Sequence, residues 1–231
     1  DYIEKMLENM QEHNCDLIVS GYTELKNNKE VERTIYINEK SNCFDVTYPK
    51  EIYNMFSSYE YNPCWKQLIR KSILIDNDIR FDKKIKYGED MLFSFYCYTN
   101  SSKTMYLKNF GYYYYINEDS VMNKKDFESL NKYYSDNSLT TSLILSNNTF
   151  SEREVQALYF KTLKVFNGIS SNFVINSCNY NEFKGYVLKA RNDYNDLFKK
   201  CDIIKFGTIK EKISLLLLKY KMIKIYYLLK K

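Results

Sequence analysis

Two adjacent carboxylates follow a glycine near the middle of the chain, in the order Gly88-Glu89-Asp90. The residues that follow predict a helix from Asp90 to about Asn100, so both acids stand at a helix N-terminus. Backbone N–H groups and the helix dipole favour ionised carboxylates there. An ionised Asp in a cleft can serve as a general base. Acidic residues are also common in first turns as caps, and capping alone is the simpler interpretation of the pattern.

A lone tryptophan, Trp65, follows Pro63 in a stretch that favours a loop. The apolar face of an indole ring can stack on a sugar ring, which makes Trp65 a candidate binding residue. Tryptophan also buries a large area, so an anchor in the core is the alternative interpretation.

Five short stretches in the first half of the chain are each weak signals, but their order along the sequence is specific. They are Asp1–Ile3, Cys15–Tyr22 (Cys-Asp-Leu-Ile-Val-Ser-Gly-Tyr), Cys64–Lys71 (Cys-Trp-Lys-Gln-Leu-Ile-Arg-Lys), Ile79–Phe93 (ending Tyr-Gly-Glu-Asp-Met-Leu-Phe) and Tyr112–Val121. The series resembles bacterial family 2 glycosyltransferases of capsule, teichoic-acid and lipopolysaccharide synthesis. The resemblance covers about residues 1–122.

This resemblance implies a partial GT-A fold, the acceptor half of a mixed sheet with flanking helices. It implies an inverting hexosyltransferase that moves a sugar from a nucleotide-sugar donor to a hydroxyl of a cell-surface glycan or lipid-linked acceptor. In such enzymes the Asp of the Glu-Asp pair is the catalytic base, and this role is carried over to Asp90. Glu89, Trp65 and Lys66 match acceptor-pocket positions. Capping and catalysis are compatible roles for Asp90.

A divalent cation, Mg or Mn, is also implied, to neutralise the departing diphosphate. Asp1 matches the last Asp of an Asp-x-Asp-Asp stretch, so the resemblance places it beside a metal motif. The chain starts without Met, and we expect it to be a fragment whose nucleotide-binding half lies upstream and which is inactive alone. One departure is Tyr115, which stands where many relatives carry Arg ahead of Ser120.

The elements that must position these residues are predicted from hydrophobic spacing. In the first part the sequence predicts a helix at 2–13, capped by Asp1 and Glu4, and strands at 16–21, 33–37, 103–107 and 110–116. It also predicts a short helix at 49–57 and an amphipathic segment from Gln67 to Ile75. From residue 126 the pattern is helical only, in segments at 126–146, 151–172, 180–199 and 206–230. We therefore expect an α/β domain at 1–125 and an all-α region at 126–231.

The last helical segment has a lysine-free arc. The arc contains Leu215, Leu218, Met222, Ile225, Tyr226 and Leu229, and the lysines around it are Lys212, Lys219, Lys221, Lys224, Lys230 and Lys231. Such a helix can lie on an anionic membrane surface, which makes 213–231 a candidate membrane contact. Packing of the arc on the preceding helices is the alternative.

Bulk composition limits the function classes. The formal net charge is +5, with no clustered basic stripe before the C-terminus, and we expect no nucleic-acid partner. The six cysteines form no CxxC pair and His13 is the only histidine, which argues against structural zinc and favours a reduced compartment. We expect a cytoplasmic protein, at the inner face of the plasma membrane if the tail binds lipid. A non-catalytic interaction module with a glycosyltransferase-like fold remains the alternative function.

Overall fold

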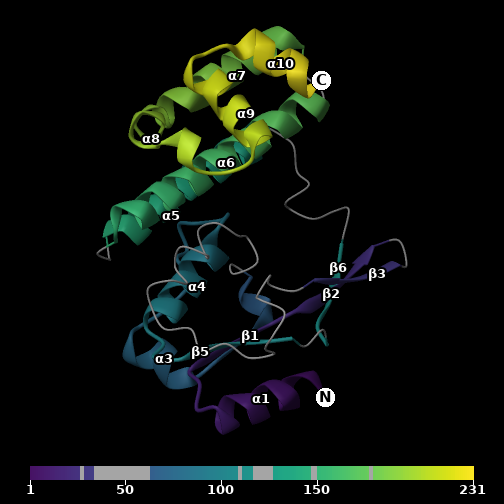
Figure 1. Cartoon of the computed structure of the whole chain (residues 1–231), viewed down its shortest axis with the longest axis vertical. Coiled ribbons are helices and arrows are strands. Elements are labelled where there is room, and N and C mark those ends of the chain that lie inside the picture. The colour runs from purple at the N-terminus through teal and green to yellow at the C-terminus, as the bar shows by residue number, and fades with distance from the viewer. Residues whose placement is uncertain (27–28, 34–62, 109–110, 117–126, 147–149, 177–178) are drawn as a thin grey trace. The chain divides into compact units, whose positions relative to one another are not determined.

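The computed structural model divides the chain into two compact units, Asp1–Asn123 and Lys124–Lys231 (Figure 1). It describes residues 1–26, 29–33, 63–108, 111–116, 127–146, 150–176 and 179–231. The first unit combines strands with helices, and the described part of the second unit is helical. This is the predicted fold class. The helix predicted at 49–57, and residues 34–37 of a predicted strand, lie outside the described residues.

The first helix, α1 (Tyr2–Glu12), has the predicted capping box. The Asp1 carboxylate accepts from the Glu4 N–H, and the Glu4 carboxylate reaches back to the amino terminus. Met6 and Met10 recur at helical spacing and are buried, and they form a small core with Ile18 of the neighbouring strand. This core holds α1 against the sheet.

A three-stranded sheet forms the centre of the first unit. Its order is β4 (Gln67–Ile69), β1 (Leu17–Ser20), β5 (Thr104–Leu107), with β1 antiparallel to β4 and parallel to β5. All four residues of β1 are buried, as its continuous apolar run predicts. The predicted amphipathic segment after Trp65 is wrong as one element, because β4 is followed at Arg70 by a separate helix, α3 (Lys71–Asp76).

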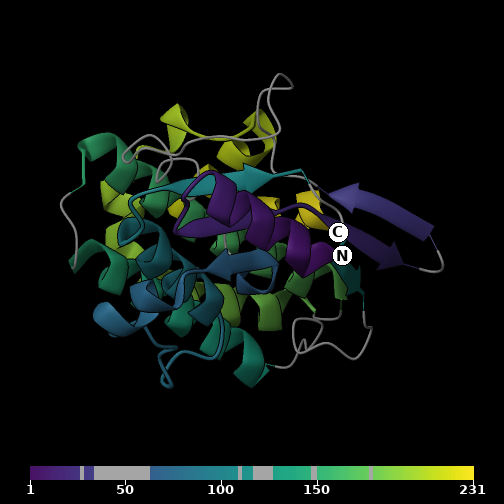
Figure 2. The same cartoon turned by 90° about the horizontal axis from the view of Figure 1, so that it is seen from below.

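A second sheet continues from the first. Its order is β3 (Lys29–Arg33), β2 (Tyr22–Lys26), β6 (Tyr113–Tyr115), again with one antiparallel and one parallel pair. Gly21 alone separates β1 from β2, and its N–H donates to the Leu107 carbonyl. The β2–β3 pair projects away from β1 and β5 in both views (Figures 1 and 2). Of the strand predicted at 33–37 only Arg33 is described, and it belongs to β3.

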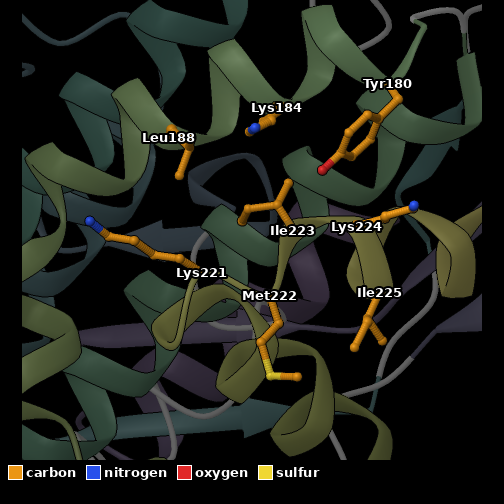
Figure 3. Close-up of a pocket in the computed structure, with 8 residues that line it drawn as sticks. All are labelled: Tyr180, Lys184, Leu188, Lys221, Met222, Ile223, Lys224 and Ile225. Carbon is orange, nitrogen blue, oxygen red and sulfur yellow. The ribbon is translucent and has the colours of Figure 1, made fainter.

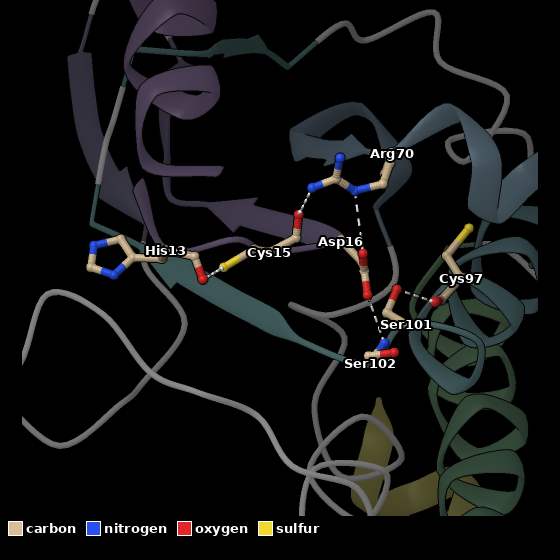
Figure 4. Close-up of polar contacts among 7 residues, drawn as sticks. All are labelled: His13, Cys15, Asp16, Arg70, Cys97, Ser101 and Ser102. Carbon is tan, nitrogen blue, oxygen red and sulfur yellow. Dashed lines mark hydrogen bonds and ion pairs between the residues drawn. The ribbon is translucent and has the colours of Figure 1, made fainter. Parts of the chain in front are cut away.

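Asp16 joins three parts of the first unit (Figure 4). Its carboxylate accepts from Arg70 Nε at 3.3 Å and from the Ser102 N–H at 2.8 Å. The Arg70 guanidinium also donates to the Cys15 carbonyl at 3.0 Å. One side chain thus ties the start of β1 to the β4–α3 junction and to the turn before β5.

We expect Asp16→Ala to lower the free energy of unfolding by about 1–3 kcal/mol, because it leaves a backbone N–H and a guanidinium without their acceptor. Urea denaturation followed by circular dichroism measures the change. Asp76→Ala, an exposed aspartate at the end of α3, is the control and should stay within about 0.5 kcal/mol of the wild type. Equal effects of the two variants would contradict the proposed junction.

The second unit is built from helices around an aromatic core. They are α5 (Phe127–Ser146), α6 (Glu152–Asn176), α7 (Tyr180–Asp193), α8 (Asn195–Lys200), α9 (Ile209–Lys219) and α10 (Ile223–Lys230), with a 3-10 turn, η4, at Ile203–Lys205. The core includes Phe166, Phe183, Tyr194, Leu215 and Tyr226. The predicted helix at 126–146 matches α5, and the one at 151–172 matches α6 except for its last turn. The segments predicted at 180–199 and 206–230 are each divided into two helices.

The predicted single helix at 206–230 is wrong because a Schellman turn ends α9. The Lys221 N–H donates to the Leu218 carbonyl and the Met222 N–H to the Leu217 carbonyl, with Lys221 at φ 57°. Glycine is the usual residue in this conformation, and a lysine there costs about 1 kcal/mol. The turn also divides the predicted arc. Leu215, Leu218 and Tyr226 enter the core, while Met222, Ile225 and Leu229 stay exposed.

Candidate functional site

The two candidate carboxylates stand at the first turn of α4 (Glu89–Thr99), which confirms the predicted helix. Gly88 precedes them in the left-handed conformation, φ 84°, which a residue without Cβ adopts at little cost. Glu89 and Asp90 are both partly exposed, whereas the five residues that follow Asp90 are buried. The buried body of α4 therefore fixes an N-terminus whose acids remain at the surface.

The Asp90 carboxylate is held by its own helix. Its Oδ1 accepts from the Met91 N–H at 2.7 Å, so part of the capping interpretation is correct. This bond orients the carboxylate and does not remove it from solvent. A role as a base stays a prediction, compatible with this geometry.

The loop that carries Trp65 lies against α4. It contains a 3-10 turn, η2 (Cys64–Lys66), directly before β4. The 3-10 turn and α4 are in contact. Burial first, and the negative charges of Asp90 and Glu89 after it, raise the pKa of the Cys64 thiol. Gln67, the first residue of β4 directly after the turn, donates from Nε2 to Ser94 Oγ on α4 at 3.0 Å. The structure thus brings the Glu-Asp pair and the Trp65 turn together.

Trp65 belongs to an aromatic cluster with Tyr22, Tyr112 and Tyr114. Its ring stacks on Tyr112 and Tyr114, with centroids 4.6 and 5.1 Å away, and meets Tyr22 edge-on at 5.0 Å. The indole is partly exposed. It is therefore an anchor between η2 and the second sheet and also part of a partly open aromatic surface. Sugar stacking by this surface stays a prediction.

Lys66 differs from its neighbour in being fully buried, with 0% of its surface exposed. Its ammonium lies 5.1 Å from the centroid of the Tyr22 ring, a cation–π distance. Its carbonyl accepts from Ser20 Oγ, which in turn bonds to the Tyr2 hydroxyl. Lys66 therefore packs behind Tyr22, whose ring contacts Trp65, and direct contact of Lys66 with an acceptor would require the side chain to move.

The tyrosines of this cluster were not predicted. Tyrosine occurs 24 times in the chain, and such abundance hides the few copies that matter. A usable signal was the spacing of Tyr112 and Tyr114, because residues two apart in extended chain point to the same side. Tyr112 directly precedes β6, and Tyr114 lies in it. Tyr115, which the sequence resemblance aligns with an Arg, lies at the end of β6 and is exposed. Ser120 lies outside the described residues.

Comparison with solved structures identifies the architecture. Residues 1–349 of S. aureus TarS in complex with UDP-GlcNAc superpose with a TM-score of 0.65 at 20% identity, over 97% of this chain and 61% of that chain. The chain has a partial glycosyltransferase fold. The UDP complex of the same TarS fragment gives a TM-score of 0.63 at 18% identity, over 98% of this chain and 60% of that one. The chain therefore spans less than two thirds of the structures it resembles.

No protein-family model and no curated protein sequence matches the chain. With identities near 20%, the likeness to TarS concerns the fold. Function has to be argued from the site.

Among the residues that the structure describes, no three His, Cys, Asp or Glu side chains gather in an arrangement that could hold a metal ion. Asp1, the predicted neighbour of the metal motif, is exposed and its carboxylate caps α1. Nor does any described helix combine the length and apolar character needed to cross a bilayer.

Proposed function

We propose that this chain forms the acceptor-side part of an inverting hexosyltransferase that uses a nucleotide-sugar donor. The observation that carries the proposal is the partly exposed Glu89-Asp90 pair, fixed at the start of α4 beside the Trp65 turn within a glycosyltransferase fold. A carboxylate in that position can accept the proton of an acceptor hydroxyl. Glu89 and Trp65 would shape the acceptor pocket.

Each residue has one task in the proposed reaction. Asp90 takes the proton as the acceptor oxygen attacks the anomeric carbon, and the Met91 N–H keeps the carboxylate oriented during the transfer. The oxygen attacks from the face opposite the leaving nucleotide, so the configuration at that carbon inverts. The aromatic cluster around Trp65 offers an apolar ring face to a sugar. A bound Mg or Mn ion would neutralise the leaving diphosphate.

A uridine diphosphate sugar is the donor class to test first. TarS was solved with UDP-GlcNAc and with UDP, and the present chain resembles those structures over nearly all of its length. The acceptor is proposed to be a hydroxyl of a cell-surface glycan or of a lipid-linked glycan.

Donor hydrolysis by the intact protein tests this proposal. We expect UDP release from at least one of a panel of UDP-sugars that includes UDP-GlcNAc, and we expect chelation of divalent cations to stop it. UDP release is measured with a coupled luminescence assay, and heat-denatured protein is the control. If the folded protein neither binds nor hydrolyses any nucleotide sugar in the presence of Mg or Mn, the non-catalytic interaction module becomes the better interpretation.

A further inference from the structure

The helix α10 has apolar residues on two faces. Its inner face, Ile223, Tyr226 and Tyr227, is buried in the core of the second unit. Its outer face is apolar too, although it is exposed. Met222, Ile225, Leu228 and Leu229 expose 45, 45, 65 and 64% of their surfaces. Single exposed apolar residues are ordinary, but four on successive turns of one helix form a patch.

Two buried contacts prevent α10 from turning this patch inward. The Tyr226 hydroxyl bonds to the Asn167 carbonyl at 3.0 Å and to Ser171 Oγ at 2.9 Å, both on α6. At the preceding turn, the Arg191 guanidinium donates to the Leu218 and Lys219 carbonyls and so caps α9. Tyr226 thus fixes the inner face of α10, and Arg191 fixes the end of α9 just before it, so the outer patch is a stable feature of the fold.

The segment that carries the patch is rich in lysine and contains no acidic residue. From Lys212 to the C-terminus the sequence contains no Asp or Glu, and it carries Lys219, Lys221, Lys224, Lys230 and Lys231. A second copy of this chain is a poor partner, because an isologous contact would bring lysine against lysine. The complementary partner is an anionic surface that also accepts apolar side chains.

A groove beside the patch has the same mixed character (Figure 3). It has a volume of about 450 Å³, and it is lined by Tyr180, Lys184, Leu188, Lys221, Met222, Ile223, Lys224 and Ile225. Figure 3 shows the hydroxyl of Tyr180, on α7, pointing toward Ile223, on α10. Lysines therefore flank an apolar floor, which suits a phosphate group attached to hydrocarbon.

Lys221 supports the same assignment through its backbone. It holds the left-handed position of the Schellman turn, at φ 57°, where glycine is the unstrained residue. A strained residue that also lines the groove suggests that its side chain has a role there.

We propose that the outer face of α10 docks on an anionic phospholipid bilayer. This outer face consists of Lys221, Met222, Lys224, Ile225, Leu228 and Leu229. A lipid headgroup phosphate occupies the groove between α7 and α10, and Leu228 and Leu229 enter the headgroup–acyl boundary. The proposal does not depend on sugar transfer, and its test does not measure transfer.

Co-sedimentation of the full chain with vesicles tests the docking. We expect binding to vesicles of equal parts phosphatidylcholine and phosphatidylglycerol, and weak binding to phosphatidylcholine alone. Lys221→Glu with Lys224→Glu should lower the partition coefficient at least about thirtyfold, since two attracted charges are lost. Leu228→Ser with Leu229→Ser should lower it about tenfold or more.

Matched controls carry the same changes elsewhere on the second unit. Ile175→Ser removes an apolar residue that is equally exposed, at 64%. Lys199→Glu with Lys200→Glu reverses two exposed lysines on α8. Both should leave binding within about twofold of the wild type, since neither lies on the outer face. Lys221→Gly should be at least as stable as the wild type and still bind less, which separates loss of charge from loss of folding.

Four results would overturn the docking. The first is unchanged vesicle binding by both outer-face variants, and the second is an equal loss in the controls. The third is displacement of the protein from vesicles by soluble glycerol 3-phosphate, because the groove would then be a site for a free phosphate. A concentration-dependent dimer that Leu228→Ser with Leu229→Ser abolishes would likewise replace the bilayer by a second copy.

Discussion

Asp90→Asn should lower the rate of sugar transfer by the intact protein about 10²–10⁴-fold, the contribution typical of a positioned general base. The substitution is informative because an asparagine oxygen can still accept the Met91 N–H, which now reaches Asp90 Oδ1 at 2.7 Å. The helix start should persist, while the group that takes the proton disappears. Initial rates at saturating donor, together with the melting temperature, measure the two effects separately.

Two further variants sharpen this test. Glu89→Gln changes the neighbouring acid and should act mainly through acceptor KM, because Glu89 is proposed to shape the pocket. Asp76→Asn, remote in sequence and exposed on α3, should leave the rate unchanged. A variant Asp90→Asn that melts normally and transfers sugar within about threefold of the wild-type rate would exclude Asp90 as the base.

Gly207→Ala should lower the free energy of unfolding by about 2–4 kcal/mol, from the left-handed backbone and the overpacking together. Gly207 lies between η4 and α9 at φ 73°, and an added Cβ would stand 2.3 Å from Phe160 Cζ. It would also stand 2.8 Å from Glu211 Oε2. That carboxylate forms the capping box of α9 with Thr208, so the new methyl group disturbs both the core and the cap.

Gly168→Ala is the matched control. Gly168 lies within α6, and a Cβ there meets no atom within 4 Å. Alanine should therefore stabilise the helix by about 0.5–1 kcal/mol. Urea denaturation of the two variants should give changes of opposite sign. If both variants changed the free energy of unfolding in the same direction, the tight packing at Gly207 would not explain a difference between Gly207 and Gly168.

Local patterns predicted the elements whose signals lie within a few residues. Examples are the Asp1–Glu4 capping box, the apolar run of β1 and the start of α4, which was predicted at Asp90 and lies at Glu89. The end of α9 was missed because Lys221 takes a conformation that sequence associates with glycine, and the bonds that fix it involve Leu217 and Leu218. No residue near Lys221 is of a type that normally marks the end of a helix.

The candidate site was predictable only in part. The pairing of Trp65 with Glu89 and Asp90 came from the order of motifs, and the structure places those elements in one region. The tyrosines that hold Trp65 come from β2 and from Tyr112–Tyr115, and only long-range strand pairing brings them together. That pairing depends on tertiary packing rather than on local propensity.

The parallel pairing of β1 with β5 has a consequence for how the chain is made. Leu17 pairs with Thr104, and Thr23 pairs with Tyr113. During synthesis β1 and β2 can pair early with their antiparallel neighbours β4 and β3, but their parallel partners β5 and β6 exist only after most of the first unit has left the ribosome. Contacts this distant in sequence form slowly. The buried run of β1 is exposed throughout that interval, so the nascent chain passes through a stage in which chaperone binding at Leu17–Ser20 would protect it from aggregation.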